Sequence, residues 1–164
     1  MNPGARTTRR RLLVLAPFPP RLDATHGGAR VIAQIVTGLG EQDDVGLVYL
    51  KSRGDADLDA AVRSATTFAE AVERSQKGGL ERRARIAAWI ARGEPVWVAE
   101  WSSPAFAQRV RTIASDWRPD VVEIEYHVMA QYLTALGGCD APRVLNVYEA
   151  GTLAVADERR HVHG

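Results

Sequence analysis

Cysteine is nearly absent from this sequence, since Cys139 is the only one among 164 residues. A single cysteine excludes an intrachain disulfide and any metal site built from several thiolates. Cys139 follows Gly137 and Gly138 in an expected loop with no activating base beside it, which favours an unreactive thiol. The pair His161 and His163 has no third ligand nearby. We therefore expect neither a bound metal ion nor a cofactor.

An excess of charge of either sign is also missing. The 21 Lys and Arg residues balance 20 Asp and Glu residues, which gives a net charge of +1. This balance offers no argument for nucleic acid or an anionic membrane as a partner. The one local excess is Arg6, Arg9, Arg10 and Arg11, and we interpret residues 1–10 as a mobile, solvated basic tail.

Two further patterns are lacking. No basic residues interleave with the four tryptophans as in a base-stacking surface, so these side chains are expected to pack in the core or in connectors. No apolar run approaches the roughly 20 residues that a spanning helix needs. The run after Arg11 is broken by Pro17, Pro19 and Pro20, and no small-residue cleavage site follows it. We expect a cytoplasmic protein without a transmembrane segment.

What the sequence does contain is a regular alternation of apolar runs and helical periodicity. Strands are predicted at 11–16, 45–50, 121–125 and 144–147. Helices are predicted from Gly27 and Gly28 to 39, at 58–65, at 80–92, from a Ser102 or Ser103 cap to 117, and at 129–136. This alternation indicates an α/β fold, a Rossmann-like parallel sheet with helices on both faces. We expect residues 11–164 to form one domain, and an incomplete one.

Three segments carry weaker or more specific predictions. Residues 66–68 form a third strand, or else residues 69–74 continue the preceding helix. Residues 96–98 are interpreted as an apolar connector. In the helix over 80–92, Leu80, Ala84, Ala87 and Ile90 recur at helical spacing and are expected to line one face.

Gly27 and Gly28 are the first candidate binding residues. A helix N-terminus favours phosphate or carboxylate, and glycine lets a ligand approach the backbone closely. The sequence contains neither the dinucleotide fingerprint G-x-G-x-x-G nor the Walker pattern G-x-x-x-x-G-K-[ST]. A purely structural turn is therefore at least as good an interpretation of this pair.

Glu125, His127 and Glu149 are the other candidates, because they follow predicted strands. Open α/β sheets place ligand-binding groups just beyond the carboxyl ends of their strands. Each has a plainer alternative: His127 can face solvent at a helix start, and Glu149 can be a carboxylate in a surface turn.

Three stretches together resemble a known enzyme family. Ala-Pro-Phe-Pro-Pro at 16–20 and His-Gly-Gly-Ala-Arg at 26–30 precede an apolar helix. Residues 118–133 contain Arg-Pro-Asp-Val-Val, a polar strand end and a helix, and residues 142–149 form a further strand with a polar end. In this order they resemble the N-terminal domain of family 4 glycosyltransferases, from Arg11 onward.

The resemblance implies specific roles. Enzymes of this family have two Rossmann-like domains that face a cleft; the N-terminal one binds the acceptor. The C-terminal one binds the nucleotide-sugar and carries a paired-glutamate motif. The resemblance places Gly27 and Gly28 near the donor phosphates and the acceptor. Many relatives have a histidine near the position of Glu125 that positions the reacting sugars; here His127 is the candidate substitute.

The functional expectation follows from this resemblance. The chain is expected to be the acceptor-binding domain of a retaining glycosyltransferase, which transfers a sugar from a nucleotide-sugar to an acceptor hydroxyl. The donor-binding half is absent from the sequence, so a separate domain must supply it and the chain alone should be inactive; whether the chain is an enzyme stays open. The alternatives are a non-catalytic Rossmann-like binding module or the remnant of a split or truncated gene. A nicotinamide-binding domain is disfavoured by the missing glycine fingerprint.

Overall fold

The computed structural model describes residues 8–74, 78–93 and 96–148, and the structural statements below concern these residues. The sheet contains the strands β1 (Arg11–Ala16), β2 (Asp44–Lys51), β3 (Phe68–Glu73), β4 (Val121–Glu125) and β5 (Arg143–Asn146). The helices are α1 (Gly27–Gly40), α2 (Ala60–Ser64), α3 (Gly79–Ala91), α4 (Val96–Trp101), α5 (Pro104–Trp117) and the 3-10 helix η1 (His127–Leu136).

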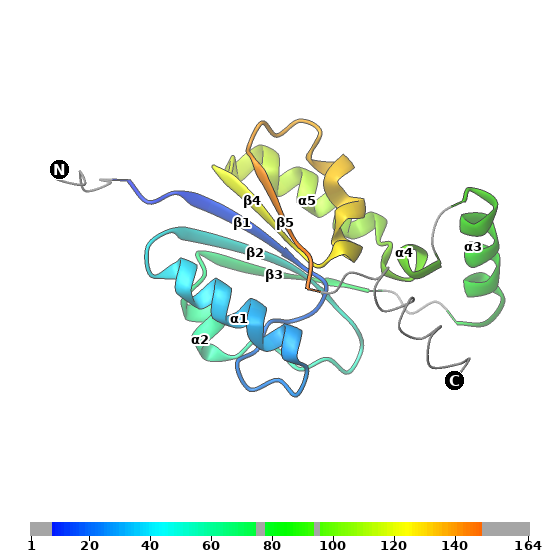
Figure 1. Ribbon diagram of the computed structural model, residues 1–164, viewed down its shortest axis with the longest axis horizontal. Coiled ribbons are helices and arrows are strands. Elements are labelled where there is room, and N and C mark those ends of the chain that lie inside the picture. The colour runs from blue at the N-terminus through cyan, green and yellow to red at the C-terminus, as the bar shows by residue number, and fades with distance from the viewer. Residues whose placement is uncertain (1–7, 75–77, 94–95, 149–164) are drawn as a thin grey trace, which may run out of the picture.

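The five strands form one parallel sheet in the order β3-β2-β1-β4-β5. Helices α1 and α2 cover one face, and α5 and η1 cover the other (Figure 1). The expected α/β fold, a Rossmann-like parallel sheet with helices on both faces, is therefore confirmed. None of the described helices combines the length and the apolar character needed to cross a bilayer.

Alternation along the central strands builds two cores. Leu13 and Leu15 of β1 pack against α5 and η1, whereas Val14 and Ala16 pack against α1. Strand β1 is buried along Leu12–Ala16 because both of its faces are covered, as its continuous apolar run predicts. The Ser103 cap on α5 is also confirmed, since its hydroxyl accepts a hydrogen bond from the backbone N–H of Phe106 at 3.2 Å.

Residues 68–73 form strand β3, so continuation of the preceding helix through 69–74 is wrong. The alternative, a third strand, is confirmed, although the strand begins at residue 68 and not at 66. Its backbone pairs in parallel with β2, where Phe68 lies opposite Gly46. The missing side chain of Gly46 makes room for the Phe68 ring, since a Cβ there would lie 2.3 Å from it. This long-range fit has no local sequence signal.

One prediction fails in the segment between β3 and α5. Residues 96–98 are not a connector but the start of helix α4. Helix α3 forms as predicted, but its apolar side stays open: Leu80 is 87% exposed and Ile90 is 58% exposed. Figure 1 shows α3 standing away from the sheet, and its main neighbour is α4. Helical periodicity in the sequence predicted this helix, but it could not predict whether the apolar side would be buried.

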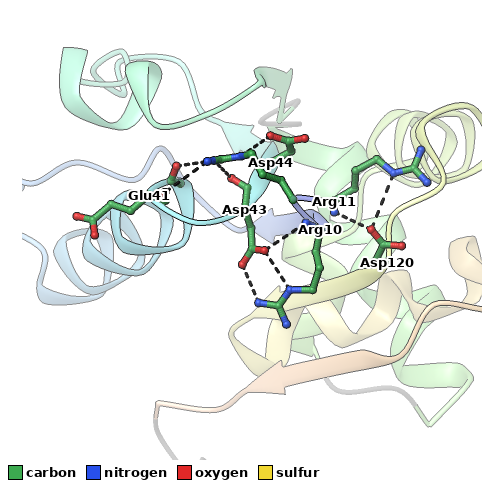
Figure 2. A network of polar contacts seen from close by, with 8 residues as sticks. Arg10, Arg11, Glu41, Asp43, Asp44 and Asp120 are labelled. Atoms are coloured by element: carbon green, nitrogen blue, oxygen red, sulfur yellow. Dashed lines mark hydrogen bonds and ion pairs between the residues drawn. The ribbon is translucent and has the colours of Figure 1, made fainter. Parts of the chain in front are cut away.

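Arginines of the basic segment remain exposed but make specific polar contacts at the amino end of the sheet. The Arg10 guanidinium binds the buried carboxylate of Asp43 with two hydrogen bonds of 3.0 and 2.7 Å (Figure 2). This pairing raises the pKa of Arg10 above its ordinary value. Arg9 binds Asp44, and the backbone N–H of Arg11 donates to Asp120 at 2.8 Å. Arg9 and Arg10 are therefore exposed, as the prediction of a solvated tail expects, but their side chains are held by partners. Residues 1–7 lie outside the described range.

Two glycines of α1 provide a test of this packing. A Cβ at Gly38 would meet nothing within 4 Å, whereas one at Gly40 would lie 2.3 Å from the carbonyl oxygen of Ala65. We expect Gly38→Ala to raise the free energy of unfolding by about 0.5–1 kcal/mol, because alanine is the better helix former. Gly40→Ala should lower it by about 1–3 kcal/mol. Urea unfolding followed by circular dichroism measures both, and effects of the same sign would contradict the packing described.

Candidate functional site

All five strands end at the same edge of the sheet, because all are parallel. Strand β1 pairs with β2 on one side and with β4 on the other. The sheet therefore extends from β1 in one direction through β2 and β3, and in the opposite direction through β4 and β5. Open α/β sheets bind ligands in the crevice at this switch point. The side chains that follow β1 and β4 therefore define the candidate site.

Tyr126 fills this crevice. It follows β4 with φ 72° and ψ 142°, a conformation that costs a non-glycine residue about 1–3 kcal/mol. Its hydroxyl lies against Gly28, where a Cβ would come within 1.8 Å of the oxygen. The ring packs edge-on against Phe18 at 5.4 Å between centroids. Gly28 is thus the residue that lets Tyr126 close the switch point.

The N-terminus of α1 is more open beside this contact. His26 caps the helix, since its Nδ1 accepts a hydrogen bond from the backbone N–H of Ala29 at 3.3 Å. Acceptance at Nδ1 puts the ring proton of neutral His26 on Nε2. A Cβ at Gly27 would meet nothing within 4 Å, and the first turn carries no acidic residue. The partial positive charge of this helix end is therefore not offset locally.

The β4–β5 half of the edge is closed by a polar cluster. Glu125 is fully buried, with an exposed fraction of 0%. The Asn146 amide donates to Glu125 Oε1 at 2.9 Å and to Glu123 Oε1 at 2.8 Å. The Tyr148 hydroxyl donates to Glu125 Oε2. Both carboxylate oxygens of Glu125 are engaged from within the domain.

Burial sets the protonation of this cluster. Burial raises the pKa of Glu123, and the neighbouring charge of Glu125 adds to this, against the hydrogen bond from Asn146. Burial and the hydrogen bond to Glu125 also raise the pKa of the Tyr148 hydroxyl, which keeps it a donor at neutral pH.

The open part of the edge lies over β1, β2 and β3. A cavity of about 600 Å³ forms there between the loop after β1, the start of α1, the loop after β2 and the end of α4. Its lining combines aromatic, hydroxyl, imidazole and charged groups. These are Phe18, Trp101, Thr25, Ser52, His26, Asp55, Arg21 and Arg74. A mostly apolar hollow with a few polar groups is the usual character of a small-molecule site.

Trp101 is positioned in this wall by a residue of η1. The buried Tyr132 hydroxyl donates to the Trp101 carbonyl at 2.6 Å and accepts from the backbone N–H of Ser103 at 2.9 Å. Burial raises the pKa of Tyr132 to about 12, so the hydroxyl remains a donor. Tyr132 thereby fixes the junction of α4 and α5, which carries Trp101 to the cavity.

The structure separates the candidates that the sequence groups together. Gly27 lies open at the start of α1, Gly28 lies under Tyr126, and Glu125 lies inside the polar cluster. His127 is the half-buried first residue of η1 and lies outside the lining of the cavity. Glu149 lies outside the described residues. The ligand-binding roles of all five stay predictions.

Sequence reasoning missed most of the cavity. Trp101 packs against the core, as predicted, but it is half-buried and also lines the wall of the cavity, which the sequence did not indicate. Ser52 and Asp55 directly follow β2, so the rule that ligands bind beyond strand ends could have found them. Arg74 follows β3, the strand whose identity the sequence left open.

No family model matches the sequence, and no curated protein is significantly similar to it. Among solved structures, the chain is similar to two crystal structures of the C-terminal domain of the PF1911 hydrogenase from Pyrococcus furiosus. The first gives a TM-score of 0.55 at 12% identity, over 87% of this chain and 98% of that chain. The second gives 0.52 at 15% identity, over 84% and 92%. At these identities the similarity shows the fold alone.

The Gly27 and Gly28 pair provides a test of the closed switch point. Gly28→Ala should lower the free energy of unfolding by about 1–3 kcal/mol, because its Cβ collides with Tyr126. Gly27→Ala should leave it unchanged or raise it by up to about 1 kcal/mol. Tyr126→Phe removes the nearest atom, so Gly28→Ala should cost less in that background. Denaturant unfolding of the cycle tests this; equal effects at both glycines, or no coupling to Tyr126, would contradict the contact.

Glu123 provides a test by pH. Its folded-state pKa lies above the unfolded value of about 4.3. Between the two values the folded chain binds more protons, so this group's contribution to stability falls as pH rises. Glu123→Gln keeps an acceptor for Asn146 but cannot ionise. The variant should therefore gain stability relative to the unaltered protein as the pH rises above about 4.3. A constant difference, or a loss over this range, would show that Glu123 is not perturbed as described.

Proposed function

We propose that this chain is the acceptor-binding domain of a retaining glycosyltransferase of the family 4 type. The whole enzyme transfers a sugar from a nucleotide-sugar to an acceptor hydroxyl, and a separate donor-binding domain completes it. The observation that carries the proposal is the cavity over β1, β2 and β3, at the edge where this fold type binds ligands.

The lining suits a saccharide. A sugar ring presents apolar C–H faces and a rim of hydroxyls, so it needs an apolar surface together with donors and acceptors. Phe18 supplies an aromatic surface, while Thr25 and Ser52 supply hydroxyls that both donate and accept. Asp55 accepts hydrogen bonds and Arg74 donates them. The open N-terminus of α1 at Gly27 is available to the donor phosphates.

Catalysis is assigned to the complete enzyme. The departing diphosphate needs electrostatic stabilisation, a large term in such transfers. Glu125, which follows β4, is buried, engaged by Asn146 and Tyr148, and outside the lining of the cavity. This observation also favours the second candidate function, a non-catalytic binding module. Val144 and Leu145 of β5 and the following Val147 are exposed, and they form an apolar strip to which a partner can bind.

The proposal predicts binding without turnover. Isothermal titration with neutral and acidic monosaccharides and short oligosaccharides should give saturable binding, and incubation with nucleotide-sugars and acceptors should give negligible transfer. Ser52→Ala should weaken binding about three- to tenfold, the effect of about one lost hydrogen bond. Ser115→Ala, at an exposed position of α5, is the matched control and should change nothing.

Three results would contradict this account. The first is the absence of binding for every saccharide tested. The second is robust transfer by the purified chain, which would show that it needs no donor-binding domain. The third is equal weakening by Ser52→Ala and Ser115→Ala, which would place the bound sugar outside the cavity.

A further inference from the structure

The cations that line the cavity differ in what neutralises them. Arg21 binds Asp23 through two hydrogen bonds, at 2.8 and 2.6 Å. Lys51, in an adjoining hollow of about 510 Å³, binds Asp57. Arg74 lines both hollows, and no carboxylate of the described residues pairs with it. Its charge is therefore available to a ligand.

Arg74 is held in place by packing. Its backbone N–H donates to the Lys51 carbonyl at 2.8 Å, which continues the pairing of β2 with β3. Its guanidinium carbon lies 4.2 Å from the centre of the Trp101 ring. A cation at this distance from an indole face is attracted by the ring, and Trp101 is fixed in turn by the bond from Tyr132. The guanidinium is thus preorganised, and its planar N–H fork matches a carboxylate or phosphate.

The stacking of Arg74 on Trp101 changes the chemical character of the surface that a ligand contacts. The guanidinium covers one face of the Trp101 ring, so that face offers a cation rather than an aromatic surface. Asp55 is the opposing charge in the lining. Its carboxylate accepts a hydrogen bond from the Ser52 backbone N–H at 2.7 Å, which holds it to its own loop. The start of α1, without an acidic residue in its first turn, adds positive potential at the same edge.

Resting on the proposed function, we propose that the acceptor is an acidic saccharide, and that Arg74 stacked on Trp101 binds its oxyanion. The shared chemistry is a carboxylate or phosphate group on the sugar. Arg74 is the residue that selects an acidic sugar over its neutral counterpart, and Phe18 of the same lining supplies the apolar contact.

Matched sugars test this by titration calorimetry on the full chain. Glucose, glucuronate and glucose 6-phosphate differ only at carbon 6, and the galactose and mannose series extend the comparison. At least one acid sugar should bind about tenfold or more tightly than its neutral counterpart, the scale of a charge-assisted hydrogen bond. Its affinity should fall with added salt. A preference for the uronate or for the phosphate identifies the source of the oxyanion.

Variants assign the preference to Arg74. Arg74→Gln should reduce the acid-over-neutral preference to less than about threefold, and Arg74→Lys should retain part of it, because charge remains without the planar fork. Asp55→Asn should strengthen binding of the acid sugar. Arg111→Gln removes one exposed cation on α5 and is the control for net charge. Thermal unfolding of each variant shows that it is folded.

The outcomes separate this inference from the proposed function. Equal affinity for neutral and acid sugars would overturn the inference and leave the function standing. An unchanged preference in Arg74→Gln, or equal loss in Arg111→Gln, would also overturn it. Inorganic phosphate that binds as tightly as the acid sugars would reduce the site to a plain anion site. Failure of every saccharide to bind would overturn the proposed function itself.

Discussion

The contact between the Tyr126 hydroxyl and Gly28 is the constraint on which the ligand-binding edge depends. It joins the end of β4 to the first turn of α1, and it occupies the crevice that this fold type usually leaves for ligands. Tyr126 reaches it only with a positive φ, and its packing against Phe18 and Tyr148 offsets that strain. Any side chain at position 28 would remove the space that the ring needs.

Closing the switch point divides the edge into two halves with different properties. Over β4 and β5, Glu123, Glu125, Asn146 and Tyr148 satisfy one another, so polar groups there hold strands together rather than bind a ligand. Over β1, β2 and β3 the edge remains hollow. Its polar groups include Arg74, whose charge no described carboxylate neutralises. The proposed binding role rests on this second half.

Local patterns in the sequence predicted much of the fold. The apolar run Leu12–Ala16 and the Ser103 cap each carry their signal within a few residues. The failures involve partners distant in sequence. The residues around Arg10 do not indicate that it pairs with Asp43, and those around Phe68 do not indicate that its ring packs against Gly46. The periodicity of α3 could not show that Leu80 is left exposed.

The candidate site was harder to predict for the same reason. Strand ends and glycine turns are local features, so the sequence could indicate the carboxyl edge of the sheet, where the cavity lies. It could not show that the Tyr126 hydroxyl packs against Gly28. Nor could it show that Tyr132 of η1 holds Trp101 of α4 in place through a hydrogen bond to the Trp101 carbonyl. The cavity therefore lies beside the predicted Gly27 and Gly28, and the preceding residue, His26, belongs to its lining.

The central claim is that a saccharide binds in the cavity over β1, β2 and β3. Amide chemical-shift mapping with a bound sugar tests it most directly. The account predicts that the largest shifts cluster at Thr25, His26, Ser52 and the Trp101 indole, with the amino edge at Arg10 and Asp120 unchanged. Shifts centred on the amino edge, or on the β4–β5 cluster around Asn146, would contradict it.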